Sequence, residues 1–293
     1  MKVSVVIVNF NTSEQLKDCL DNVFSQGQDI EVIVIDNASP DNSLEMVRNN
    51  FPSVKLVEAK ENKGLAHGSN LGLEVATGDY ILYLGSDAYP EKGVITGIAE
   101  FMDKSTDVGI STCKLVLRNG SLDMDAHRGF PTPWASLTYF SKLNLLFPKS
   151  KIFNQYFLGY KDFTDPHEID LCISHFMFVR KKVFDEVGKW DEDFFVFGED
   201  VDFCYRVKKA GWKIMYLPQF TAVHYKGVSV GTRKESKDIS KASNETKLKM
   251  RKSTTEAMKL FYKKHYSGVY PKIVQNLVLS GIDLLAKLRN KKV

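Results

Sequence analysis

Short apolar runs alternate with mixed polar segments through the N-terminal part of the chain. The runs cover residues 3–8, 31–36, 54–57 and 80–84. Near-continuous apolar runs of this length are typical of strands buried on both faces of a sheet. The segments between them predict three helices: one over 13–25 that Thr12 or Ser13 caps, one that follows the turn at 37–43 and ends near residue 50, and one over 65–76. Strands that alternate with helices pair in parallel, so the pattern predicts an α/β fold with a mostly parallel central sheet flanked by helices.

Polar side chains follow each predicted strand. Asn9, Asp36 and Asp87 come at or just after strand ends, and Asn62 follows the third strand. Ligands of doubly wound sheets bind beyond the carboxyl ends of the parallel strands. We therefore expect the ligand site at this edge of the sheet.

The second half of the chain is less regular. Residues 118–168 are rich in aromatic residues and prolines, and we expect loops and short helices over one face of the sheet. Beyond them the pattern predicts strands at 171–179, 213–217 and 221–224, and helices starting near 180 and covering 199–210, 235–265 and 270–290.

Charge divides the chain into two parts. Residues 1–232 carry 24 lysines and arginines against 31 aspartates and glutamates, whereas residues 233–293 carry 16 against 5. We expect a globular domain over 1–232 and a basic helical extension over 233–293. A basic extension on an acidic body favours an anionic partner, and nucleic acid is disfavoured because no recognition motif accompanies the charge.

An apolar stripe in residues 266–293 narrows the choice of partner. Ile273, Leu277, Leu284 and Leu288 recur at helical spacing between lysines and arginines. Such a helix suits the anionic cytoplasmic face of a membrane. Packing on the main domain or on a second subunit is the equal alternative.

Composition and cysteine usage predict a cytoplasmic protein, peripheral at the cytoplasmic face of the membrane. Hydrophobic residues make up 43% of the chain and charged residues 26%, as in soluble globular proteins. The four cysteines show no paired spacing and are expected to be reduced, packed thiols. No signal pattern precedes the first strand, and no apolar run reaches the roughly 20 residues of a membrane span.

Adjacent carboxylates open the predicted helix over 199–210. The motif is Gly198-Glu199-Asp200-Val201-Asp202. A carboxylate at a helix start can act as a general base, and the helix dipole should lower its pKa. His224, downstream, can complete a metal site. Asp202 and Arg206, four residues apart, are expected to form a surface ion pair.

Taken in order, these motifs resemble the family-2 glycosyltransferases of the GT-A fold, and most of all their rhamnosyltransferase-like branch. The resemblance covers about residues 3–230 and rests on the segments 5–11, 34–39, 62–64, 68–72, 78–87, 187–195 and 198–206 with Pro218 and His224. It implies an inverting enzyme. Such an enzyme moves a hexose, rhamnose among the candidates, from a nucleotide sugar to a hydroxyl of a glycan or polyprenyl-linked acceptor.

The resemblance also implies residue roles. The nucleotide sugar would contact Asn9, Asn11, Asp36, Asn37, Asn62, Gly64, Asn70, Ser86 and Asp87. Asp200 would take the proton from the acceptor hydroxyl, with Glu199 orienting the acceptor or its loop. The acceptor would meet Ser174, His175, Trp190 and Asp191. Asp87 and His224 would hold Mg²⁺ or Mn²⁺. Turn chemistry is the alternative for Asn9, Asn11, Asp36 and Asp87, and a glycine-permitted turn with helix packing is the alternative for the segment 62–72. Complementing the helix dipole is the alternative for Asp200, a structural role for His224, and core packing for Trp190.

Three positions depart from the family pattern. Gly85 stands where many relatives have an acid or Asn, which should lower metal affinity or leave more water on the ion. Ser174-His175 stands where relatives have Gly-Ala, which should narrow or re-polarise the donor-sugar or acceptor pocket. His67 is also unusual in its motif. These departures bear on sugar specificity rather than on the reaction class.

Other functions fit less well. A sugar nucleotidylyltransferase needs a Gly-rich loop with Lys or Arg after the first strand, and residues 9–13 have none. A G-x-G-x-x-G sequence, the mark of a Rossmann oxidoreductase, is missing there too. A catalytically impaired scaffold that binds a glycan or a membrane is the alternative from another class, because Gly85-Ser86-Asp87 is an altered motif.

Overall fold

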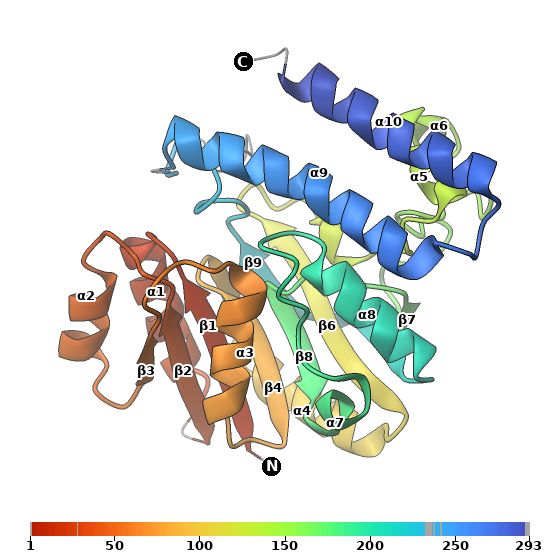
Figure 1. Ribbon diagram of the computed structural model, residues 1–293. Helices are drawn as coiled ribbons and strands as arrows, with labels where there is room; N and C mark the ends of the chain where they lie inside the picture. The colour runs from red at the N-terminus through yellow and green to blue at the C-terminus, as the bar shows by residue number, and fades with distance from the viewer. Residues whose placement is uncertain (1, 28, 232–235, 237, 241, 291–293) are drawn as a thin grey trace.

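The computed structural model describes residues 2–27, 29–231, 236, 238–240 and 242–290, and its centre is one mixed sheet (Figure 1). The strand order is β3-β2-β1-β4-β8-β6-β9-β5, and β7 pairs with β9. The bounds are β1 Val3–Asn9, β2 Ile30–Asp36, β3 Lys55–Glu58, β4 Tyr80–Gly85, β5 Ala88–Pro90, β6 Val108–Leu117, β7 His167–Ile169, β8 Phe176–Arg180 and β9 Lys213–His224.

Strand direction changes halfway across the sheet. Strands β3, β2, β1 and β4 are parallel, as the alternation predicted. Strand β8 is antiparallel to both β4 and β6, and β5 and β7 are antiparallel to β9, whereas β6 and β9 are parallel. The α/β prediction is confirmed. The second half of the sheet is mixed because its strands are not joined by the regular strand–helix–strand connections of the first half: β5 follows β4 after a short turn, and several elements separate β6 from β8.

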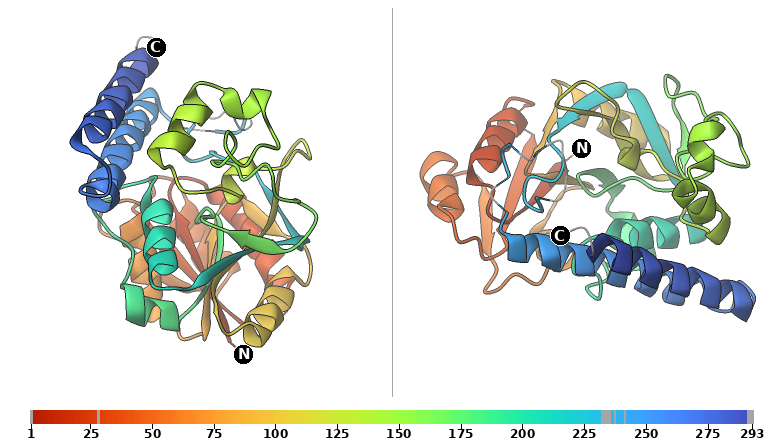
Figure 2. Two further views of the ribbon diagram at one scale, coloured as in Figure 1. Left: turned by 90° about the vertical axis from the view of Figure 1, so that its right-hand side faces the viewer. Right: turned by 90° about the horizontal axis from the view of Figure 1, so that it is seen from above.

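Helices cover both faces of the sheet (Figure 2). The helices α1 Ser13–Phe24, α2 Ser43–Asn50 and α4 Val94–Lys104 share one core with the sheet, and α3 Leu65–Val75, α7 Lys182–Val187 and α8 Glu199–Lys209 share the other. Alternate residues of β1 serve the two sides: Val5 and Ile7 belong to the first core, and Val6 to the second. Such two-sided burial is why the strand is apolar throughout. The four cysteines are buried free thiols, as expected.

The structure corrects several sequence-based boundaries. β5, α4 and β6 were not predicted, and β8 begins at Phe176 rather than at residue 171. The two short strands predicted near the end of the domain form one strand, β9. Its pairing with β6 slips between Leu217 and Thr221, around Pro218, which lacks the N–H that a regular ladder needs.

The region 118–168 is irregular, as predicted. It contains a 3₁₀ turn and two short helices: η1 Met124–Ala126, α5 Pro133–Phe140 and α6 Leu143–Leu146.

Two long helices follow the sheet. The helix α9 Asn244–Tyr266 packs on α8 through Phe261, Tyr262 and Tyr266, and α10 Lys272–Asn290 packs on α9. The prediction that this helix starts at 235 is wrong for the described residues 236, 238–240, 242 and 243; residues 235, 237 and 241 lie outside those described. The helix begins after Ser243 because its hydroxyl accepts a hydrogen bond from the Thr246 amide, at 3.0 Å.

Candidate active site

The carboxyl edge of the parallel strands gathers the predicted polar residues. Asn9 and Asp36 are register partners at the ends of β1 and β2. The Asn9 amide donates to Asp36 and to Ser39, both at 3.0 Å, and the Ser39 amide donates to Asp36 at 2.9 Å. Asn9 is fully buried, and its side chain shapes the loop around Asp36. Its direct contact with the nucleotide sugar stays a prediction.

A hydroxyl chain connects this loop to the end of β4. Thr12 donates to the Asn9 side-chain oxygen at 2.7 Å, and its hydroxyl lies 2.9 Å from that of Ser86. Thr12 occupies the cap position of α1, as predicted, although its side chain makes no cap hydrogen bond. The backbone amide of Asn11 donates to the Ser39 hydroxyl at 3.0 Å. The loops that follow β1, β2 and β4 therefore form one connected group.

A second cluster joins the loop after β2 to the segment before α3. The side-chain amide of Asn37 donates to Asn62 Oδ1 at 3.0 Å and to the Gly64 backbone carbonyl at 3.1 Å. The backbone amide of Gly64 also donates to Asn62 Oδ1, at 3.0 Å. Gly64 has φ +99°, and an added Cβ would come 2.0 Å from the Phe195 carbonyl oxygen. Only glycine fits this close approach. Asn37 Oδ1 is buried without a hydrogen-bond partner among the described residues, and it is therefore the free acceptor of the cluster.

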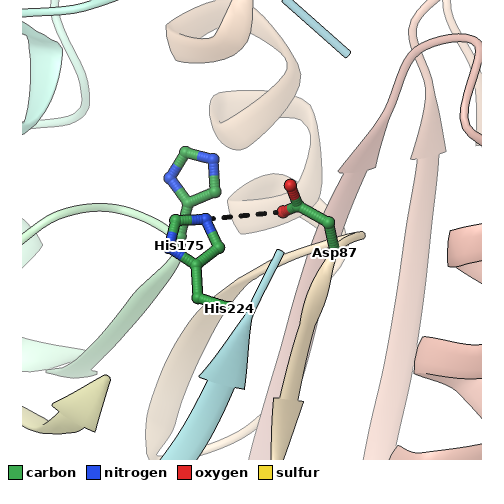
Figure 3. Close-up of side chains that lie close together, drawn as sticks. All are labelled: Asp87, His175 and His224. Carbon is green, nitrogen blue, oxygen red and sulfur yellow. Dashed lines mark ion pairs between the residues drawn. The ribbon is translucent and has the colours of Figure 1, made fainter. Parts of the chain in front are cut away.

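Asp87, His175 and His224 converge beside the end of β4 (Figure 3). Their potential ligand atoms all lie within 4.8 Å of one another. His224 Nε2 is 3.7 Å from Asp87 Oδ1, and in the described part of the chain it has no hydrogen-bond partner. A buried ring nitrogen with no hydrogen-bond partner among the described residues, 3.7 Å from a carboxylate and beside a second imidazole, has the donor set and the spacing that a divalent metal takes, so these residues fit such an ion.

Asp123, which the sequence analysis missed, orients His224. Its Oδ2 accepts from His224 Nδ1 at 2.8 Å, and Lys226 contacts its Oδ1 at 2.5 Å. Burial opposes ionisation of Asp123, but His224 and Lys226 lower its pKa below the usual range. With Nδ1 donating to a carboxylate, Nε2 of His224 is left as the acceptor that a metal requires. Asp123 lies in the irregular region, more than a hundred residues before His224, and no local pattern marks it.

Glu199 and Asp200 start α8, and both are buried. Burial and the neighbouring Asp200 raise the pKa of Glu199 to about 8. Burial also raises the pKa of Asp200, and Arg128 acts against that rise from 3.5 Å. The prediction that the helix start lowers this pKa is therefore wrong, because removal from water outweighs the dipole. Because the Arg128 guanidinium lies beside Asp200, the geometry favours the negative charge of the pair on Asp200 and a shared proton on Glu199.

Arg128 is the second residue that the sequence analysis missed. Its guanidinium donates to the Asp125 carbonyl at 2.8 Å and to the Tyr156 hydroxyl at 3.2 Å, which fixes it against Asp200. Ser174 connects this pair to the histidine cluster, because its hydroxyl lies 3.5 Å from Glu199 and it precedes His175. Ser174 is therefore the link along the chain between the Glu199–Asp200 pair and the cluster of His175, His224 and Asp87.

Two predicted contact residues have structural roles in the fold. Trp190 is 3% exposed and stacks on Phe203 in the core, which was the alternative given for it. Asn70 holds the loop before α8: its side chain donates to the Trp190 carbonyl and accepts from the Trp190 backbone amide, each at 3.0 Å. The ligand contacts of both residues stay predictions.

The predicted Asp202–Arg206 pair forms at 2.8 Å but is not on the surface. Asp202 is fully buried under α9, where it also accepts from His265 and Lys264, each at 2.7 Å. Burial acts against the charge, but these partners lower the pKa of Asp202 to about 2. Asp191 similarly pairs with Lys264 at 2.5 Å. Basic residues of α9 thus neutralise acids of the domain.

Comparison with known proteins identifies the family. The model of "Glycosyl transferase family 2" matches residues 4–188. The chain is 25% identical to the rhamnosyltransferase WbbL of Escherichia coli K12 over 230 residues, which are 76% of this chain and 83% of WbbL.

Solved structures share the fold. Staphylococcus aureus TarS residues 1–349 with UDP-GlcNAc matches with TM-score 0.59 at 18% identity, over 96% of this chain and 71% of that one. The mannosyltransferase PcManGT of Pyrobaculum calidifontis with GDP-Man and Mn²⁺ matches with TM-score 0.54 at 17% identity, over 97% and 80%. The sheet, its flanking helices and the matched family model lead to one conclusion: this chain belongs to glycosyl transferase family 2, whose members transfer sugars from nucleotide-sugar donors.

Proposed function

We propose that the chain transfers a hexose, with rhamnose the first candidate, to a hydroxyl of a glycan or polyprenyl-linked glycan with inversion at the anomeric carbon. The observation that carries the proposal is the buried approach of His224 Nε2 to Asp87, joined through His175 and Ser174 to the Glu199–Asp200 pair. The similarity to WbbL supports rhamnose. Cell-wall or surface-polysaccharide assembly is the corresponding process.

Asp200 is the base in this proposal. The acceptor oxygen attacks the anomeric carbon, its proton passes to the Asp200 carboxylate, and the bond to the diphosphate breaks with its electron pair leaving on the diphosphate. Glu199, protonated, donates a hydrogen bond that orients the acceptor. Asp87 and His224 would hold Mg²⁺ or Mn²⁺, which supplies positive charge against the leaving diphosphate. Asp36, Asn11, Asn37, Asn62, Gly64 and Ser86 form the donor pocket, and Asp191, Ser174 and His175 border the acceptor.

A donor panel tests this function. We expect the purified protein, with Mn²⁺ and no acceptor, to release nucleotide slowly from one nucleotide sugar, dTDP-rhamnose first among those tried. Chromatographic detection of free nucleotide measures it, and chelation by EDTA is the control. No release from any donor, together with no nucleotide binding by calorimetry, would favour the non-catalytic scaffold.

We also propose that residues 1–232 form the catalytic domain and that α10 places this domain on an anionic membrane surface. Ile273, Leu277, Leu284 and Leu288 are each more than half exposed, whereas Val278 and Leu279 of the same helix face α9. Lys272 and Lys287 are exposed on this helix. Leu145 and Leu146 of α6 are also exposed, and Figures 1 and 2 place α6 at the same end of the molecule as α10. In the described part of the chain, no helix has the length and apolarity to cross a membrane.

Vesicle flotation tests the membrane proposal. The wild-type chain should float with vesicles containing phosphatidylglycerol, and Leu277→Asp/Leu284→Asp should lose most of that binding because each buried apolar side chain contributes about 1.5–3 kcal/mol. Leu248→Asp, at an equally exposed leucine on α9, is the matched control. If the double variant instead converts a dimer to a monomer without changing flotation, the stripe is a subunit interface.

A further inference from the structure

We propose that His175 is a third metal ligand, so that this chain holds its ion with two imidazoles and one carboxylate and prefers a transition metal to Mg²⁺. The inference rests on the proposed function, since it concerns the ion held by Asp87 and His224. It goes beyond that function by assigning a ligand and a metal class. In the proposed function His175 borders the acceptor, and here its imidazole also binds the ion.

Backbone pairing places both histidines beside Asp87. In the antiparallel β4–β8 pair, Leu84 is opposite Phe176, and the Gly85 amide donates to the His175 carbonyl at 3.0 Å. In the β5–β9 pair, Ala88 is opposite His224, and the Tyr225 amide donates to the Asp87 carbonyl at 2.9 Å. The turn that carries Asp87 is thus held between the two histidines by main-chain hydrogen bonds.

The side chains use this placement. The rings of His175 and His224 have centroids 4.7 Å apart, and one ligand atom from each histidine and from Asp87 falls within the 4.8 Å cluster. Figure 3 shows both rings on the same side of the Asp87 carboxylate. A neutral imidazole at this position offers one ring nitrogen lone pair to an ion held by Asp87 and His224.

Gly85 provides the space for His175. A Cβ at position 85 would come 2.7 Å from His175 Cδ2 and 3.0 Å from Asp87 Oδ1. A side chain at 85 and the imidazole of His175 therefore compete for the same volume beside the carboxylate. Where an acid at position 85 could serve the ion, this chain has an imidazole instead.

The presence of the His175 imidazole in place of an acid at position 85 determines which kind of metal ion this site prefers. The three side chains carry one negative charge and offer two nitrogens. Imidazole nitrogen suits Fe²⁺, Co²⁺ and Zn²⁺ better than it suits Mg²⁺, which prefers oxygen ligands, and Mn²⁺ stands at the weak-binding end of the transition-metal series. Two histidines and one carboxylate on one side of an ion also leave open positions for the oxygens of a diphosphate.

Metal binding by the intact chain tests the assignment without relying on activity. In calorimetric titrations with Co²⁺, Mn²⁺ and Mg²⁺ alone, wild type should bind Co²⁺ and Mn²⁺ more tightly than Mg²⁺. His175→Ala should weaken Co²⁺ binding at least about tenfold and change the visible absorption of bound Co²⁺, because a nitrogen ligand is lost. His67→Ala, a histidine paired with Glu192 outside the cluster, should change neither. Circular dichroism verifies the fold of each variant.

A double variant tests whether a side chain at position 85 and the imidazole of His175 compete for the same space. Gly85→Asp alone should lose metal affinity through its clash with His175, whereas Gly85→Asp/His175→Ala should regain binding with its preference moved toward Mg²⁺. Unchanged Co²⁺ affinity and spectrum in His175→Ala, with loss in His224→Ala, would overturn the assignment while leaving the proposed function intact. Nucleotide release that needs no divalent ion in wild type would instead overturn the metal-dependent function.

Discussion

Asp200→Asn should lower the rate of sugar transfer by about 10²–10⁴-fold, the usual contribution of a general base. The substitution keeps the size of the side chain and removes its ability to accept the proton of the acceptor hydroxyl. Asp200 is buried beside Arg128 at 3.5 Å, and Glu199 lies next to it in the chain. Transfer from the donor that the panel identifies, measured at saturating acceptor, gives the rate.

Donor binding separates a lost base from a lost fold. The dissociation constant of the donor with Mn²⁺, measured by calorimetry, should stay near the wild-type value in Asp200→Asn. Asp193→Asn is the matched control, because Asp193 is an exposed aspartate in the loop before α8. If Asp200→Asn keeps its transfer rate and Glu199→Gln loses it, the base is Glu199.

The pH dependence of the transfer rate also tests whether Asp200 is the general base. The base must be ionised, so the rate should fall as the pH drops through its pKa. Burial raises the pKa of Asp200 from its ordinary value, and this decline should therefore begin at a higher pH than for an exposed aspartate. Removing the neighbouring charge with Arg128→Met should move the decline to still higher pH.

The predictable parts of this molecule are those with local signals. The strand β1 is apolar on both faces, and the polar residues at strand ends follow from strand–helix alternation; hence Asn9, Asp36 and Asp87 were placed at one edge. The spacing of Asp202 and Arg206 also predicted their contact. Their burial was not predictable from that spacing, because it depends on His265 and Lys264 of a helix about 60 residues further along.

The parts that the sequence could not predict depend on long-range contacts. Asp123 and Arg128 lie in a region without hydrophobic periodicity, and their partners His224 and Asp200 come 101 and about 70 residues later. His175 was recognised as an unusual residue, but its relation to Gly85 requires the antiparallel register of β4 and β8. Sequence alone gave no direction for β8, since its connection from β4 contains several elements.

Asp87→Ala should abolish metal-dependent release of nucleotide from the donor, with a loss of at least about a hundredfold, since a bound ion supplies several kcal/mol of charge stabilisation. Asp87 is the single carboxylate in the cluster with His175 and His224, and its loss leaves two neutral imidazoles for the ion. The release assay of the donor panel measures the effect. Raising Mn²⁺ should restore little activity, because no anionic ligand remains.

Two control variants show whether the loss of nucleotide release is specific to Asp87. Asp107→Ala, which removes an exposed aspartate paired with Lys213, should leave release unchanged. Asp200→Asn should retain slow release to water better than it retains transfer to an acceptor hydroxyl if Asp200 serves mainly the acceptor. If Asp87→Ala and wild type release nucleotide equally, the diphosphate leaves without an ion at this cluster. In that case His224, protonated at its buried Nε2, would donate a hydrogen bond directly to the phosphate. If Asp87→Ala loses release while Asp200→Asn keeps donor binding, the two carboxylates have separate roles. Asp87 then stabilises the leaving group, and Asp200 removes the acceptor proton.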